Sequence, residues 1–282
     1  MQIIHTSHEL AQCCQQWRQA GETIAFVPTM GHYHQGHMDL MRHARTLGSK
    51  LVVSHFTNFT QFTSEESTKA YPRDAEQDGD IAASLGVDAF FVPTPGQMFT
   101  PDHATWVDAP NLTRCLCGQI RPTHFRGVCT EVMKLFMLTQ ASTAVFGEKD
   151  WQQLVIVKRM VQDLFLPITI VSRPTVRSYD GLALSSRNIL LTPEESTRAC
   201  EIYKGLCFAK SLVDQGETSV GFLRDKVLHR WMERIPQARL DYLTVVQPDT
   251  LEILEKVGDH ALMACAVRVG KARLIDNIML KG

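Results

Sequence analysis

The chain has 282 residues, of which 44% are hydrophobic and 21% are charged, and its formal net charge at pH 7 is -1. This composition is typical of an ordinary globular protein, and the length predicts one large domain with a smaller one. A nearly neutral balance excludes a general attraction for nucleic acid or an anionic membrane, so an anionic ligand must meet local cations. We therefore expect small-molecule partners, with no nucleic acid and no membrane.

The eight cysteines form no C-x-x-C pair and no regular ladder of spacings. They are expected to be reduced packing thiols rather than zinc ligands or a disulfide scaffold. The stretch from Met1 to His5 lacks the regions of a signal peptide, and no apolar run approaches the roughly 18 residues of a membrane span. These features favour a cytoplasmic enzyme.

The first half of the chain alternates helices and strands. Residues 8–20 are predicted to form a helix with Ser7 as its N-cap and Gly21 as its stop. The elements expected next are a strand at 24–27, a helix from His37, and then a strand at 51–54, a helix at 75–85 and a strand at 89–92. Strands joined by helices through short connections pair in parallel.

Residues 94–123 show no sustained period and are predicted to be a long excursion over the mouth of the sheet. The alternation then resumes with a helix at 128–138, a strand at 144–146, a helix at 151–163 and a strand at 168–171. From Val176 the composition becomes charged and helix-rich, with helices at 193–213 and 220–235 and strands at 261–267 and 273–277. The pattern predicts a Rossmann-like, doubly wound α/β domain at 1–175 and a smaller α+β domain at 176–282.

The turn after the first apolar strand is the first candidate site. In a doubly wound sheet, a nucleotide binds where a strand ends and a helix begins, because free N–H groups and the helix dipole favour phosphate. His34 and His37 flank Gly36 in this turn, and two imidazoles so placed are predicted to bind one phosphate chain. The alternative is that His34 caps a loop and His37 is an ordinary residue at a helix start.

Two further clusters carry polar donors at the predicted ends of later elements. Lys149 lies within Gly147-Glu148-Lys149-Asp150, where it offers a cation at a helix start beside carboxylates suited to a ribose hydroxyl. Arg187 follows Ser185 and Ser186 in a glycine-containing loop, and its guanidinium has the fork geometry that suits phosphate oxygens. The alternatives are a helix N-terminus with a solvated lysine, and a plain inter-domain loop.

At this point the chain resembles the pantothenate synthetase (pantoate–beta-alanine ligase) family. The similarity runs in order through nearly the whole chain, whereas the His-x-Gly-His turn alone implies only the wider nucleotidyltransferase superfamily. The matching stretches are Pro28-Thr29-Met30-Gly31, His34-Gln35-Gly36-His37, Tyr71-Pro72-Arg73, His124-Phe125-Arg126-Gly127-Val128, Phe146-Gly147-Glu148-Lys149-Asp150, Gln152-Gln153 and Asp180-Gly181-Leu182-Ala183-Leu184-Ser185-Ser186-Arg187-Asn188.

The resemblance implies a two-step, ATP-dependent ligation in pantothenate biosynthesis. Pantoate and ATP give pantoyl adenylate and pyrophosphate, and the amine of β-alanine then displaces AMP. The family also implies a homodimer, a C-terminal domain that helps to close the cleft, and Mg²⁺ carried with the ATP phosphates, since the sequence shows no all-protein metal cage.

The resemblance assigns site residues by position. The catalytic residues implied are His34, His37, Lys149, Ser186 and Arg187, with His37 as the candidate proton donor. Gln61 and Gln153 match the pantoate glutamines, and Gln61 is also expected to touch β-alanine; the alternative for each is an ordinary surface glutamine. The ATP contacts implied are Met30, Gly31, His32, Tyr33, His34, Gln35, Gly36, His37, Gly147, Glu148, Lys149, Asp150, Val176, Leu184, Ser185, Ser186 and Arg187.

The chain departs from the family near the expected acid pocket. Residues 55–62 read His-Phe-Thr-Asn-Phe-Thr-Gln-Phe, where the family usually has Ile-Phe-Val-Asn-Pro-x-Gln-Phe. His32, Tyr33 and Glu131 also replace the family's usual residues, and Glu131 stands at an apolar position. An adenylating ligase for another small hydroxy acid or amine is therefore the alternative function, and a catalytically silent dimeric scaffold is the alternative from another class.

Overall fold

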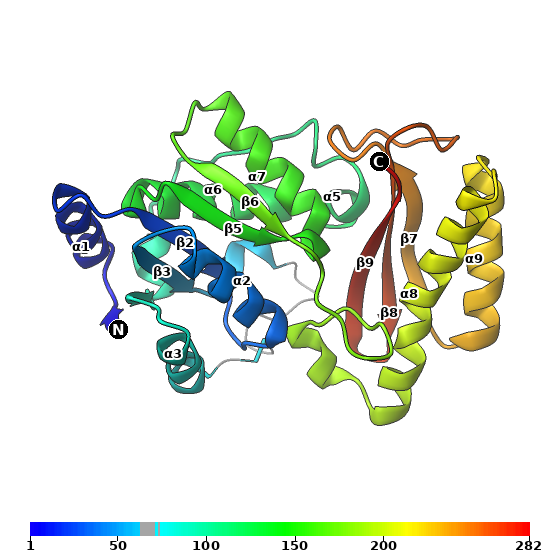
Figure 1. Ribbon diagram of the computed structural model, residues 1–282, viewed down its shortest axis with the longest axis horizontal. Helices are drawn as coiled ribbons and strands as arrows, with labels where there is room; N and C mark the ends of the chain where they lie inside the picture. Colours follow the sequence, from blue (N-terminus) through cyan, green and yellow to red (C-terminus); the bar gives the residue numbers. More distant parts are fainter. Residues whose placement is uncertain (63–70, 73) are drawn as a thin grey trace. The chain divides into compact units, whose positions relative to one another are not determined.

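The computed structural model describes residues 1–62, 71–72 and 74–282. They form two compact units, of which the first holds residues 1–113, 121–148 and 156–174, and the second holds 114–120, 149–155 and 175–282. Each unit contains a β-sheet of its own (Figure 1). Arg73, part of one matching stretch, lies outside the described residues. Our division of the chain after residue 175 stays a proposal.

The sheet of the first unit is parallel throughout, which confirms the predicted doubly wound α/β class. The strand order is β1-β4-β3-β2-β5-β6, so the direction of winding reverses between β2 and β5. The strands are β1 (Gln2–Ile4), β2 (Ile24–Thr29), β3 (Lys50–His55), β4 (Ala89–Phe91), β5 (Thr143–Gly147) and β6 (Thr169–Arg173).

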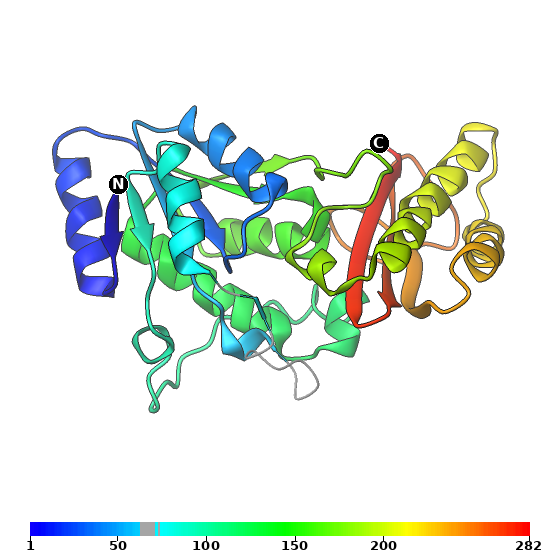
Figure 2. The same cartoon turned by 90° about the horizontal axis from the view of Figure 1, so that it is seen from below.

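Helices cover both faces of this sheet, as Figure 2 shows for α2 and α3 on one face and α6 on the other. Successive side chains of a strand point to opposite faces. In β2, Ala25 and Val27 therefore pack against Met41 of α2, whereas the ring of Phe26 lies 6.3 Å from that of Phe136 on α6. The helices are α1 (Ser7–Gln19), α2 (Gln35–Arg45), α3 (Ala75–Ser84), α4 (Pro95–Met98), α6 (His124–Thr139) and α7 (Trp151–Asp163).

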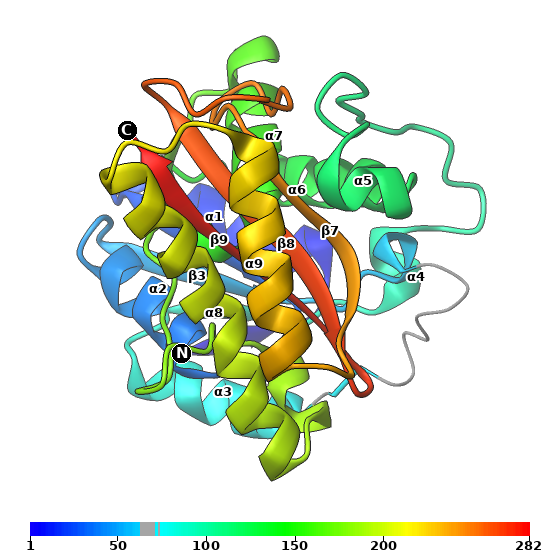
Figure 3. The ribbon, with the colours of Figure 1, turned by 90° about the vertical axis from the view of Figure 1, so that its right-hand side faces the viewer.

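The second unit contains an antiparallel sheet, in the order β7-β8-β9, with two long helices across one face (Figure 3). Buried side chains from α8, α9 and all three strands form a single hydrophobic core. The elements are α5 (Leu116–Ile120), α8 (Pro193–Asp214), α9 (Val220–Arg234), β7 (Arg239–Val246), β8 (Ala261–Val269) and β9 (Ala272–Lys281). This small α+β arrangement also agrees with the predicted fold class.

Several local predictions were wrong. Helix α1 begins at Ser7 and is capped by Thr6, because the Thr6 side chain accepts from the Glu9 amide and Glu9 reaches back to the Thr6 amide. Helix α6 begins at His124, earlier than expected, and the excursion at 94–123 contains α4 and α5. Strands β1 and β7 were not predicted.

Within the described residues, no helix is long and apolar enough to cross a bilayer. All eight cysteines are free thiols, as expected, and burial raises the pKa of Cys14 and Cys129 to about 12.

Candidate active site

The turn that follows β2 has a strained backbone that depends on glycine. Gly31 has φ of +86° and His32 has φ of +55°, so two consecutive residues adopt left-handed conformations. A Cβ on Gly31 would lie 2.3 Å from Nε2 of His55, far inside van der Waals contact. The absence of a side chain at position 31 therefore allows His55 to lie directly beneath the turn.

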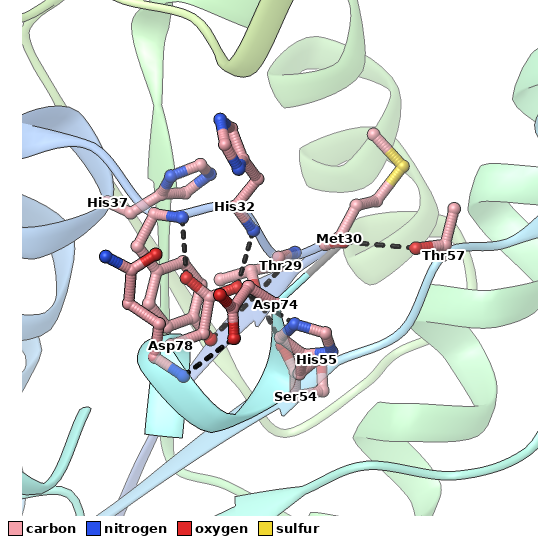
Figure 4. A network of polar contacts seen from close by, with 12 residues as sticks. Thr29, Met30, His32, His37, Ser54, His55, Thr57, Asp74 and Asp78 are labelled. Carbon is pink, nitrogen blue, oxygen red and sulfur yellow. Dashed lines mark hydrogen bonds and ion pairs between the residues drawn. The ribbon is translucent and has the colours of Figure 1, made fainter. Parts of the chain in front are cut away.

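A buried carboxylate holds this turn from the other side. Asp78, in the first turn of α3, accepts hydrogen bonds from the backbone amides of His32 at 2.6 Å and Tyr33 at 2.8 Å. Its Oδ2 also lies 2.9 Å from Nε2 of His55, and both side chains are buried. Figure 4 shows Asp78 beneath the turn, with the side chains of Met30 and His32 pointing away from it. Successive amides of this kind form an anion site, which the protein's own carboxylate fills.

Two hydroxyl groups fix the strand end that leads into the turn. The Thr29 hydroxyl donates to the Ser54 carbonyl at 2.6 Å and lies 3.1 Å from the phenol oxygen of Tyr33. The Thr57 hydroxyl donates to the Met30 carbonyl at 3.2 Å. Burial raises the pKa of Tyr33, so its phenol stays protonated near neutral pH.

His34 is the N-cap of α2. Its Nδ1 accepts from the backbone amide of Gly36 at 3.1 Å, while its own amide lies 3.4 Å from Nδ1 of His37. A neutral imidazole that accepts at Nδ1 carries its proton on Nε2. The two ring centroids are 4.2 Å apart. The structure thus brings together the two histidines predicted to bind phosphate.

This arrangement changes the expected source of donors. The backbone amides of His32, Tyr33, His34 and Gly36 all have partners inside the protein. These four amides are therefore already occupied, whereas sequence reasoning had counted on free backbone N–H groups as well as on the imidazoles.

The sheet places a second turn beside the first. Because β2 and β5 are neighbours and parallel, their carboxyl ends at Thr29 and Gly147 lie at the same edge. A ligand of an open parallel sheet binds at this kind of reversal in strand order. The Glu148 carboxylate after β5 accepts a hydrogen bond from the Ser172 hydroxyl at 2.8 Å.

Gln61 lies in a separate part of the first unit, at the end of the 3₁₀ turn Phe59–Gln61. Asn58 caps this turn and donates to the Gly127 carbonyl on α6 at 3.0 Å. A Cβ on Gly127 would lie 2.5 Å from the Thr60 hydroxyl oxygen, so glycine permits the close approach of turn and helix. Gly127, which belongs to one of the stretches that match the family, therefore allows the loop that carries Gln61 to pack against α6.

The Gln61 side chain is paired with the unusual Glu131. Its Nε2 donates to Oε2 of Glu131 at 2.8 Å, and both side chains are buried. Burial raises the pKa of Glu131 to about 8, and hydrogen bonds from Asn58 and Gln61 oppose this rise. The Gln61 carbonyl accepts from Arg121 at 2.8 Å and lies 2.9 Å from Nδ1 of His124.

The remaining predicted site residues lie in the second unit. Lys149 and Ser185, far apart in sequence, line the same small hollow together with Asp276. The Lys149 carbonyl accepts from the Asn277 side chain at 3.1 Å. Gln153, in the first turn of α7, is half-buried. Its neighbour Gln152 is buried and bridges backbone groups of Cys115 and Cys117, which gives it a structural role.

The loop that carries Arg187 is a folded element. Val176 and Leu184 are joined by a backbone hydrogen bond of 3.0 Å, which brings these two predicted ATP contacts together. Arg177 anchors the loop through two hydrogen bonds of 2.6 and 2.7 Å to Asp276 on β9. Ser185 then caps a 3₁₀ turn, Ser186–Leu190, by accepting from the Arg187 amide.

Sequence reasoning missed Asp78 and Arg177. Asp78 shares the buried face of α3 with Gly79 and Ala82, so a carboxylate at i with alanine at i+4 was the available signal. Among the described residues, no group of three or more His, Cys, Asp or Glu side chains is arranged to hold a metal ion.

Comparisons with known proteins give a consistent result over the full length. The family model described as Pantoate-beta-alanine ligase matches residues 2–279. The chain is 60% identical over 280 residues to the pantothenate synthetase of Desulfovibrio desulfuricans, covering 99% of both chains. It is 51% identical over 282 residues to that of Nitratidesulfovibrio vulgaris strain Miyazaki F, covering all of both chains.

Solved structures agree. Pantothenate synthetase from Thermus thermophilus superposes with a TM-score of 0.93 at 40% identity, with complete coverage of both chains. Pantoate-beta-alanine ligase from Francisella tularensis, complexed with beta-gamma ATP and beta-alanine, gives a TM-score of 0.81 at 30% identity over 99% of this chain and 98% of that one. The chain therefore belongs to the pantoate–beta-alanine ligase family.

Proposed function

We propose that this pantoate–beta-alanine ligase makes pantothenate in two steps at the residues described above. A pantoate carboxylate oxygen forms a bond to the α-phosphorus of ATP, and the bond from that phosphorus to the bridging oxygen breaks, which releases pyrophosphate. The amine nitrogen of β-alanine then attacks the carbonyl carbon of the adenylate. AMP leaves with the oxygen, and the amide nitrogen loses its extra proton.

The paired histidines are the observation that carries this proposal. In the first step, negative charge builds on the phosphoryl oxygens and on the leaving pyrophosphate. Fixed Nε2–H donors on His34 and His37 bind that charge better in the transition state than in the ground state. His37 is the candidate proton donor among them. The two rings stand at the helix N-terminus where the strand order reverses, which is where such a sheet binds a nucleotide.

We assign the remaining contacts on the same chemical grounds. Lys149, Ser186 and Arg187 supply donors to the phosphates, and the segments 30–37, 147–150 and 184–187, with Val176, contact ATP. Gln61 and Gln153 bind pantoate, with Gln61 also touching β-alanine. We take Mg²⁺ to enter as part of MgATP, since phosphate oxygens are its usual ligands. A cytoplasmic homodimer with a closing C-terminal domain completes the proposal.

Pyrophosphate exchange into ATP tests the first step. The purified protein with magnesium is compared with no acid, with pantoate and with other small hydroxy acids. Exchange that depends on pantoate supports the proposal, and β-alanine is then expected to convert the adenylate to pantothenate. Exchange driven only by another acid would show that residues 55–62 and Glu131 define a different acid pocket, and no exchange with any acid would favour a silent scaffold.

The variant His37→Ala tests the mechanism. It is expected to lower the exchange rate about tenfold or more, which corresponds to about 1.4 kcal/mol of lost transition-state stabilisation. A fully active variant would remove His37 from the reaction.

A further inference from the structure

Glu131 is a buried carboxyl group for which the reaction above has no use. It lies on α6 with 4% of its surface exposed, and Gln61, its hydrogen-bond partner, is 7% exposed. The contact between Gln61 Nε2 and Glu131 Oε2 is 2.8 Å long. Burying a carboxyl group raises the free energy of the folded state unless the group makes hydrogen bonds. The presence of Glu131 at this position therefore calls for an explanation.

The rest of Gln61 is already fixed by other contacts. Its backbone amide donates to the Asn58 carbonyl at 3.2 Å. Its carbonyl accepts from Arg121 and lies within hydrogen-bonding distance of His124. With the backbone fixed and the side chain buried, the terminal amide can still rotate, which exchanges the positions of its oxygen and nitrogen.

Glu131 restricts this rotation of the Gln61 amide. The Glu131 oxygen that accepts from Gln61 Nε2 would repel the amide oxygen in the flipped orientation, even when the other oxygen of Glu131 carries a proton, so the amide nitrogen of Gln61 is held toward Glu131. The amide oxygen Oε1 is then the end that is left for a ligand. A hydroxyl group donates readily to such an oxygen, whereas a carboxylate does not.

We infer that Glu131 is a positioning residue that makes Gln61 present its amide oxygen to a hydroxyl group of the acid substrate. This inference rests on the proposed function, in which Gln61 contacts pantoate. It gives the departure at position 131 a specific effect on the acid site, since an apolar residue there leaves the Gln61 amide with two orientations.

The experiment measures the KM for pantoate and for ATP in pyrophosphate exchange, for the unchanged enzyme, Glu131→Leu and Glu131→Gln. Leucine removes the acceptor, and glutamine both donates and accepts, so it holds the amide less strictly. We expect the KM for pantoate to rise roughly three- to tenfold in Glu131→Leu, and less in Glu131→Gln, with the KM for ATP unchanged. Thr139→Val, which removes a buried hydroxyl further along α6, is the matched control.

A double-mutant cycle separates positioning from a general effect on the helix. If Glu131 acts through Gln61, then Glu131→Leu changes the KM for pantoate less than about twofold in the Gln61→Ala background. The inference is overturned if Glu131→Leu raises both KM values equally, or acts as strongly without Gln61, or has no effect. Thermal unfolding shows whether each variant is folded. If Glu131→Leu does not fold, the KM values of Glu131→Gln test the inference in its place. Absence of pantoate-driven exchange in the unchanged enzyme overturns the proposed function and this inference together, whereas unchanged KM values in active variants overturn the inference alone.

Discussion

The carboxylate of Asp78 lies 2.6 Å from the backbone nitrogen of His32, and this contact ties helix α3 to the turn that carries the paired histidines. The same carboxylate oxygen is 2.9 Å from Nε2 of His55. The conformation of the turn therefore depends on a residue that has no contact with the phosphate chain in the proposed mechanism.

Asp78→Asn is expected to lower the exchange rate about tenfold, because the amide offers one oxygen where three donors converge. Hydrogen bonds to charged groups contribute about 1.5–3 kcal/mol each, so the melting temperature is expected to fall as well. Exchange kinetics and thermal unfolding measure both effects. Asp80→Asn, an exposed change on the same helix, serves as the control and should leave both values nearly unchanged. Equal behaviour of the two variants would contradict the role of Asp78.

The two roles of His34 can be separated by substitution. Asparagine is a good N-cap residue but lacks the Nε2–H group, whereas alanine lacks both. His34→Asn is therefore expected to stay close to the unchanged enzyme in stability, while His34→Ala loses about 1 kcal/mol. Both variants should lose about tenfold or more of the exchange rate. Full activity in His34→Asn would show that His34 serves only to cap α2.

Gly31→Ala tests the strain in the turn. Its Cβ would meet the His55 ring at 2.3 Å, in a backbone region that alanine rarely adopts. We expect a loss of stability of roughly 1–3 kcal/mol and a higher KM for ATP. Gly96→Ala is the control, since Gly96 has no neighbour within 4 Å of the added Cβ and no left-handed φ. If Gly31→Ala changed neither the stability nor the KM for ATP, the turn would have to accommodate the added Cβ without strain.

Glu131 is expected to make stability depend on pH. Burial raises its pKa from 4.5 to about 8 in the folded chain. Between these values the folded chain keeps a proton that the unfolded chain has released. The resulting stabilisation is fully present below the unfolded-state pKa and is lost as the pH rises toward the folded-state pKa, by at most about 1.4 kcal/mol per pH unit.

Urea unfolding at about pH 5 and about pH 8 measures this effect. Glu131→Gln does not titrate at this position, so its stability relative to the unchanged protein should increase between the two pH values. Glu252→Gln, at an exposed position, is the matched control. The prediction fails if the Glu131→Gln and unchanged proteins follow parallel curves.

The sequence predicted the strand, turn and helix around His34 because an apolar run and a glycine mark them clearly. The start of α2 was misplaced by two residues, since histidine is not among the usual N-cap residues. Strand β1 is three residues long with two of them exposed, and β7 begins with two exposed residues. Neither shows the apolar pattern by which strands are recognised.

The supporting polar contacts were beyond sequence reasoning for a different reason. Glu131 is visible as a charged residue in a mostly apolar helix, and Asp78 is one of several acidic residues at the start of α3. Their partners Gln61 and His32 lie 70 and 46 positions away. No local pattern links such pairs. Only the packing of α3 and α6 against their loops does so.

The position of β5 beside β2 also has a consequence for folding while the chain is being synthesised. Strands β1 to β4 precede β5 in the chain, so one flank of β2 has no neighbour until residues 143–147 have been added. An apolar strand with an open flank is the kind of edge that pairs with other chains. The pairing of β5 with β2 covers this flank and places the turns after β2 and β5 at the same edge of the sheet.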